Sequence, residues 1–65
     1  MYSLVGVNGN AYALMGYTQR AMKENGFSEI DIKKMIADAT SDDYDNLIRV
    51  CDSWIEKVNK KVGDC

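Results

Sequence analysis

Histidine and proline are absent from this chain of 65 residues, and cysteine occurs only twice. Because no imidazole is present, Cys51 has no histidine to act as its general base, which excludes a cysteine nucleophile of the usual kind. No cluster of residues has the spacing of a metal site, and no catalytic motif is complete. A chain of this length also lacks the volume for a substrate cavity. The sequence therefore predicts a protein that is not an enzyme and that needs no metal and no cofactor.

Long apolar runs are also missing. No stretch approaches the roughly 20 apolar residues that cross a bilayer, and residues 1–15 have neither the basic region nor the cleavage site of a secretory signal. The two cysteines do not predict a disulfide, because a helix from Cys51 to Val62 advances roughly 16 Å and Cys65 would have to return to within ~7 Å. Two free thiols fit a reducing compartment. We therefore expect a cytoplasmic protein with no membrane partner.

An excess of positive charge is also missing. The chain has a net charge of −2 and a pI near 4.8, whereas a domain that binds nucleic acid usually has a pI above about 9. A nucleic-acid partner is therefore disfavoured, and the weaker alternative would have to use Lys57, Lys60 and Lys61. Acidic residues are concentrated between Glu29 and Asp52, where seven acids stand against three bases.

Three segments do show the helical spacing of apolar residues, and we predict helices at residues 11–24, 29 to 38 or 39, and 42–61. Each is preceded by a residue whose side chain can cap the first turn, namely Asn10, Ser28 and Ser41. The prediction is an all-α fold, a three-helix bundle with a short extended N-terminal segment. It forms a single small helical domain over residues 1–65.

The apolar stripes of the three helices predict a small core. Its expected members are Leu14, Met15, Ile36, Leu47, Ile48, Trp54 and Ile55. A chain of this size buries only about 60% of the surface that its unfolded form exposes. Metals, disulfides or oligomerisation usually supplement such a core.

The first predicted helix carries the residues that we favour for contact with a partner. Gly16 lies inside this helix, where glycine costs about 1 kcal/mol relative to alanine. It permits close approach either of another helix or Trp54 within the fold, or of a partner protein. Tyr12, Tyr17 and Arg20 lie off the apolar stripe, and tyrosine and arginine are frequent at interface hot spots. The tyrosines could equally flank a small core with their hydroxyls in water, so both interpretations stay open.

A second candidate contact surface is acidic. Asp42, Asp43 and Asp45, with Asp38 nearby, crowd the start of the third predicted helix. The helix dipole favours negative charge there, so capping and solubility explain most of the cluster. The alternative is an acidic face that mimics nucleic-acid phosphates and occupies the basic groove of a partner. A calcium site would need a loop glycine and a glutamate at the twelfth position, and both are missing.

Nearly the whole chain resembles a family of small uncharacterised proteins from Firmicutes genomes and mobile elements. The resemblance rests on a Gly-Asn-Ala-aromatic opening, a later glycine and alanine, and a Ser-x-x-Tyr-Asp segment before the last helix. The matching residues are Gly9, Asn10, Ala11, Tyr12, Gly16, Ala21, Ser41, Tyr44 and Asp45. The resemblance implies a setting and no mechanism. Short acidic proteins of phages and mobile elements are often similar to inhibitors of host defence, anti-CRISPR proteins among them.

Composition and resemblance together predict a non-enzymatic protein-binding module. Its partner would be a larger host protein, such as a nuclease effector complex of host defence, met by the first helix or by the acidic start of the third. The alternative is a self-associating, homodimeric helical protein whose exposed apolar surface is its own interface.

Overall fold

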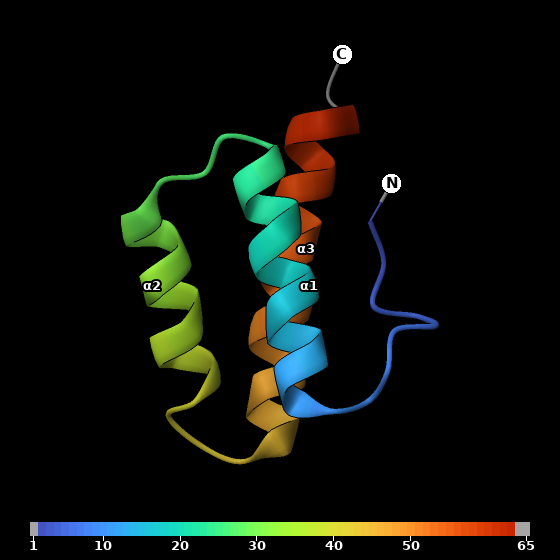
Figure 1. Cartoon of the computed structure of the whole chain (residues 1–65), viewed down its shortest axis with the longest axis vertical. Helices are drawn as coiled ribbons and strands as arrows, with labels where there is room; N and C mark the ends of the chain where they lie inside the picture. The colour runs from blue at the N-terminus through green and yellow to red at the C-terminus, as the bar shows by residue number, and fades with distance from the viewer. Residues whose placement is uncertain (1, 64–65) are drawn as a thin grey trace.

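A computed structural model describes residues 2–63, in which the chain folds into three helices: α1 (Ala11–Glu24), α2 (Glu29–Ala39) and α3 (Tyr44–Gly63). α1 and α3 pack side by side and run in the same direction, α2 returns antiparallel along one flank, and the N-terminal segment lies along the other (Figure 1). No strand occurs in these residues. The predicted all-α three-helix bundle is confirmed. None of the three helices is both long enough and apolar enough to span a membrane.

Local capping decides where each helix begins. Asn10 caps α1, because its side-chain oxygen accepts a hydrogen bond from the Tyr12 N–H at 2.8 Å, and Ser28 caps α2 in the same way. The prediction of Ser41 as the cap of α3 was wrong. The cap is Asp43, whose Oδ1 accepts from the Asn46 N–H at 3.0 Å. The Ser41 hydroxyl instead donates to the Asp38 carbonyl at the end of α2, so α3 begins two residues later than residue 42.

The Asp43 cap leads to a stability prediction with a matched control two residues away. Asp43→Ala removes the acceptor of a first-turn N–H and is expected to lower the free energy of unfolding by about 1 kcal/mol. Ser41→Ala, an alanine substitution in the same exposed turn, is expected to cost less because no N–H of α3 depends on it. Urea titrations followed by circular dichroism compare the two variants. A larger loss for Ser41→Ala would contradict the assignment of the cap.

The core lies where the apolar stripes of the helices meet. Leu14, Leu47, Trp54 and Ile55 are buried, as predicted. Ile48 is 37% exposed, so its placement in the core was wrong. It lies at the edge of the α3 stripe, and Met15 and Ile36 likewise lie at the margin of the core and are half-buried. The largest fully buried side chains are those of Thr18, Met22, Met35, Cys51 and Val58.

The N-terminal segment is folded back along the helices rather than simply extended. The Val7 N–H donates to the Leu4 carbonyl at 3.1 Å, which closes a β-turn in which Gly6 has a φ of +86°. Residues that have a Cβ rarely adopt a positive φ of this size, so glycine suits this position. Leu4 and Val7 pack against the core, whereas Val5 at the tip of the turn is 91% exposed. This arrangement covers one side of the α1–α3 pair.

Candidate functional site

Three of the predicted contact residues lie together on the outer surface of α1. Tyr12, Gly16 and Arg20 are spaced four residues apart, which places them in one row along a helix, and all three are exposed. We call this row the α1 face. Tyr12 is 82% exposed, although it is a large aromatic side chain in a small protein. The row is therefore an aromatic and a cationic side chain with bare backbone between them.

Gly16 contradicts the expectation of an internal packing partner. Apart from its two neighbours and the backbone of α1 itself, a Cβ at this position would meet no atom within 4 Å, so neither another helix nor Trp54 packs against it. The missing side chain leaves a shallow hollow of about 400 Å³ beside Arg20 and Lys23. Of the two interpretations of Gly16, close packing within the fold is excluded. The approach of a partner remains a prediction.

Tyr17 is separated from the α1 face. Its hydroxyl accepts a hydrogen bond from the Ser3 N–H at 3.0 Å. Its ring meets that of Tyr2 edge to face, with centroids 6.2 Å apart and the rings inclined at 70°. The side chain is half-buried under the N-terminal segment. Tyr17 thus flanks the core, which is the second of the two interpretations that the sequence left open for the tyrosines.

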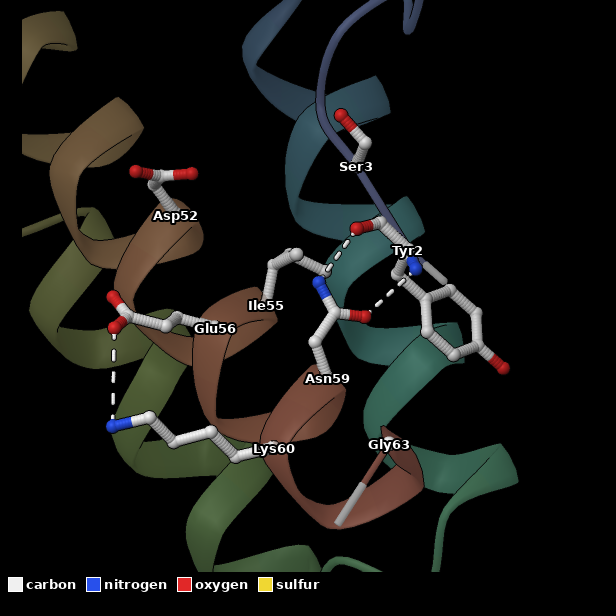
Figure 2. Close-up of a pocket in the computed structure, with 8 residues that line it drawn as sticks. All are labelled: Tyr2, Ser3, Asp52, Ile55, Glu56, Asn59, Lys60 and Gly63. Atoms are coloured by element: carbon white, nitrogen blue, oxygen red, sulfur yellow. Dashed lines mark hydrogen bonds and ion pairs between the residues drawn. The ribbon is translucent and has the colours of Figure 1, made fainter.

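The N-terminal segment is held to α3 by a pair of hydrogen bonds that sequence reasoning missed. The Tyr2 N–H donates to the Asn59 side-chain oxygen, and the Asn59 side-chain amide donates to the Tyr2 carbonyl, each at 2.7 Å (Figure 2). At the end of α1, the Tyr2 hydroxyl donates to Glu24 and accepts from the Asn25 amide. We call the two bonds between Asn59 and Tyr2 the Asn59 clamp. The only feature of the sequence that could have indicated this clamp is the position of Asn59, an amide side chain beside the apolar stripe of α3.

A shallow hollow of about 730 Å³ lies between the clamped segment and α3. Asp52 and Glu56 rise from α3 on one side, and the Tyr2 ring points away from them on the other (Figure 2). Glu56 forms an exposed ion pair with Lys60 at 3.9 Å. Within residues 2–63 no three potential metal ligands gather here or elsewhere. The hollow is wide and contains no converging set of chemical groups.

The acidic start of α3 is mostly explained by its own backbone. Asp43 is the cap, and Asp42 accepts the Asp43 N–H at 2.9 Å. Asp45 lies in the first turn, where the helix dipole favours its charge. The Tyr44 hydroxyl donates to the Gly9 carbonyl, so this acidic turn and the start of α1 occupy the same end of the bundle (Figure 1).

The thiol of Cys51 lies in the core, and its surroundings change its pKa. Cys51 is fully buried. Burial raises the pKa of the thiol above its ordinary value, and a hydrogen bond with Thr18 lowers it by a smaller amount. The thiol is therefore protonated and shielded at neutral pH, as expected for a small core side chain. The other predicted thiol, Cys65, lies outside the described residues.

No family model matches this chain, and no curated protein or solved structure is detectably similar to it. The resemblance to the Firmicutes and mobile-element family therefore stays a prediction.

Proposed function

We propose that this protein is a non-enzymatic protein-binding module that contacts its partner through the α1 face. The exposure of Tyr12 carries the proposal, because an aromatic ring that is 82% exposed gains its apolar burial only from outside the fold. Tyrosine and arginine are over-represented at binding hot spots. Gly16 lies between them and offers bare backbone that another helix could approach closely.

The charge of this surface defines the partner further. Arg20 and Lys23 border the hollow beside Gly16, and Glu24 is the single acid there. A complementary partner would present an apolar pocket for Tyr12 and a carboxylate for Arg20. A larger host protein, such as a nuclease effector complex of host defence, is the partner that the family resemblance supports. In this proposal Asp42 and Asp45 form a second contact surface, which lies at the end of the bundle where α1 begins.

The α1 face makes a testable prediction in which stability and binding change in opposite directions. Gly16→Ala is expected to raise the free energy of unfolding by about 0.5–1 kcal/mol, because the position is helical and open. The same substitution inserts a methyl group where a partner helix would approach and is expected to weaken binding. Tyr12→Ala is expected to abolish capture of the partner while leaving the helical signal unchanged.

The measurement is affinity capture from a host lysate with the immobilised chain as bait, alongside thermal melts of each variant. Ile30→Ala is a matched control, because Ile30 is 78% exposed on α2 and outside the α1 face. Retention of the same protein by wild type and Ile30→Ala, but not by Tyr12→Ala, supports the proposal. Equal retention by all three would refute the α1 face as the contact surface.

The alternative function, self-association, is favoured by one feature of the same row. Tyr12 and Arg20 are each four residues from Gly16. Two antiparallel copies of α1 that cross at Gly16 would place each Tyr12 beside the Arg20 of the other copy, a cation–π arrangement. Sedimentation equilibrium decides between the functions. A concentration-dependent dimer that Tyr12→Ala dissociates supports self-association, and a strict monomer rejects it.

A further inference from the structure

A basic hollow lies between α2 and α3, away from the α1 face. It has a volume of about 250 Å³, and its wall carries three cations, Lys34 from α2 and Arg49 and Lys57 from α3. Asp38 is the only acid that lines it. The chain as a whole has more acidic than basic residues, 10 against 8. The gathering of three cations at one small surface therefore runs against the overall balance of charge.

None of these three cations forms an ion pair within 4 Å among the described residues. In the part of the chain that the structure describes, the one ion pair within 4 Å joins Glu56 to Lys60, outside this hollow. Lys57 lies over the ring of Trp54, with its Nζ 4.1 Å from the ring centroid. That contact orients the ammonium group without cancelling its charge. The hollow thus presents partly positioned positive charge to an incoming ligand.

The spacing of the cations indicates the shape of that ligand. Arg49 and Lys57 are eight residues apart on α3, which corresponds to about 12 Å along the helix axis. Because the two side chains leave the helix this far apart, an extended ligand that carries two anionic groups can contact both at once. Val50 and Trp54 line the wall as well, and they offer apolar contact between the two charges.

We propose that the α2–α3 hollow docks an acidic segment of a partner protein, with two carboxylates that flank an apolar residue. Val50 and Trp54 offer apolar contact that an aliphatic side chain of a peptide can meet, and we therefore take a peptide as the occupant. The net charge of −2 also opposes a long polyanion that would extend beyond the hollow. This inference goes beyond the α1 face and does not depend on it.

A synthetic peptide tests this assignment directly. In an extended peptide, two glutamates four residues apart span about 13 Å, close to the separation of Arg49 and Lys57 along the helix axis, and a leucine is placed between them. Trp54 is the single tryptophan of the chain, so its fluorescence reports occupancy. We expect saturable binding of this peptide at low ionic strength. The peptide with both glutamates changed to glutamine is expected to bind at least about tenfold more weakly.

Charge reversal on the protein provides the second arm of the test. Arg49→Glu combined with Lys57→Glu is expected to weaken binding of the acidic peptide at least about tenfold. Lys33→Glu combined with Lys60→Glu changes the net charge equally but outside the hollow, since both residues are exposed and neither lines it. This control is expected to lose less than about twofold after circular dichroism has shown that both variants are folded.

Three results would overturn the proposal. The first is the absence of any saturable change with the acidic peptide at low salt. The second is an equal loss of affinity in both charge-reversed variants, because that would show general electrostatic attraction. The third is tighter binding of a single-stranded oligothymidylate than of the peptide, which would assign the hollow to nucleic acid. The capture experiment with Tyr12→Ala tests the α1 face only, and its result does not bear on the binding of the acidic peptide to the α2–α3 hollow.

Discussion

Trp54→Ala is expected to leave the chain largely unfolded at room temperature. Trp54 is the largest side chain of the core and is 9% exposed. Phe27 meets its ring edge to face at 6.1 Å, and Lys57 lies over its ring. Truncation of a buried tryptophan to alanine costs about 3–5 kcal/mol. A hydrophobic core below about 70 residues rarely supplies more than that in total.

The measurement is far-UV circular dichroism with a urea titration, and the chain contains its own control. Tyr12→Ala removes an aromatic ring of similar size from a position that is 82% exposed, so its effect is expected to stay within about 0.5 kcal/mol. Trp54→Phe keeps an aromatic ring in the core and is expected to unfold cooperatively at a lower urea concentration than wild type. A Trp54→Ala variant with a wild-type midpoint would show that the core is not centred on this residue.

The features that were predictable from the sequence are those set by neighbouring residues. The side chains of Asn10 and Ser28 bond to N–H groups only two or three residues ahead, so their capping role is evident from local sequence. The start of α3 was harder, because Ser41, Asp42 and Asp43 are consecutive candidates. The choice depends on where α2 ends, since the Asp38 carbonyl engages the Ser41 hydroxyl.

Gly16 and Tyr17 show what the helical periodicity of the sequence can predict about the surroundings of a side chain, and what it cannot. Phase places Gly16 on the side of α1 opposite Leu14 and Ala21, so its open surroundings follow from the pattern once the inward face is fixed. The environment of Tyr17 does not follow in this way. Its cover comes from Tyr2 and Ser3, and nothing in the local pattern brings the N-terminal segment back over this part of α1.

The Asn59 clamp was the feature that the sequence made least predictable. Tyr2 and Asn59 are 57 residues apart, and an asparagine on a helix surface is ordinarily solvated. The α2–α3 hollow was missed for a related reason. The sequence suggested a basic group of Lys57, Lys60 and Lys61, whereas the structure brings Lys57 together with Lys34 and Arg49. Only the antiparallel packing of α2 against α3 creates that neighbourhood.

Asn59→Ala is expected to loosen the start of the N-terminal segment while the three helices stay folded. Both hydrogen bonds of the clamp are 2.7 Å long and partly buried, and their loss is expected to cost about 1–3 kcal/mol. The contact between the rings of Tyr2 and Tyr17 should weaken with them, because the clamp holds the Tyr2 backbone in place. Proton NMR follows this through the nuclear Overhauser effects between the two rings. Lys60→Ala, one residue away and exposed, is expected to preserve those effects.

Asn59→Asp distinguishes the clamp from simple filling of space, because its effect depends on pH. A protonated carboxyl group can accept from the Tyr2 N–H and donate to the Tyr2 carbonyl, as the amide does. An ionised carboxylate cannot donate and instead faces the carbonyl oxygen. The folded state therefore favours the protonated form, which raises the pKa of the introduced group above the unfolded value of about 3.9. Below pH about 3.9 the protonated aspartic acid therefore contributes its full stabilisation to the variant. This contribution is lost as the pH rises through the pKa of the group in the folded state. A deficit of the same size at pH 3 and pH 7 would show that the paired hydrogen bonds do not hold the segment.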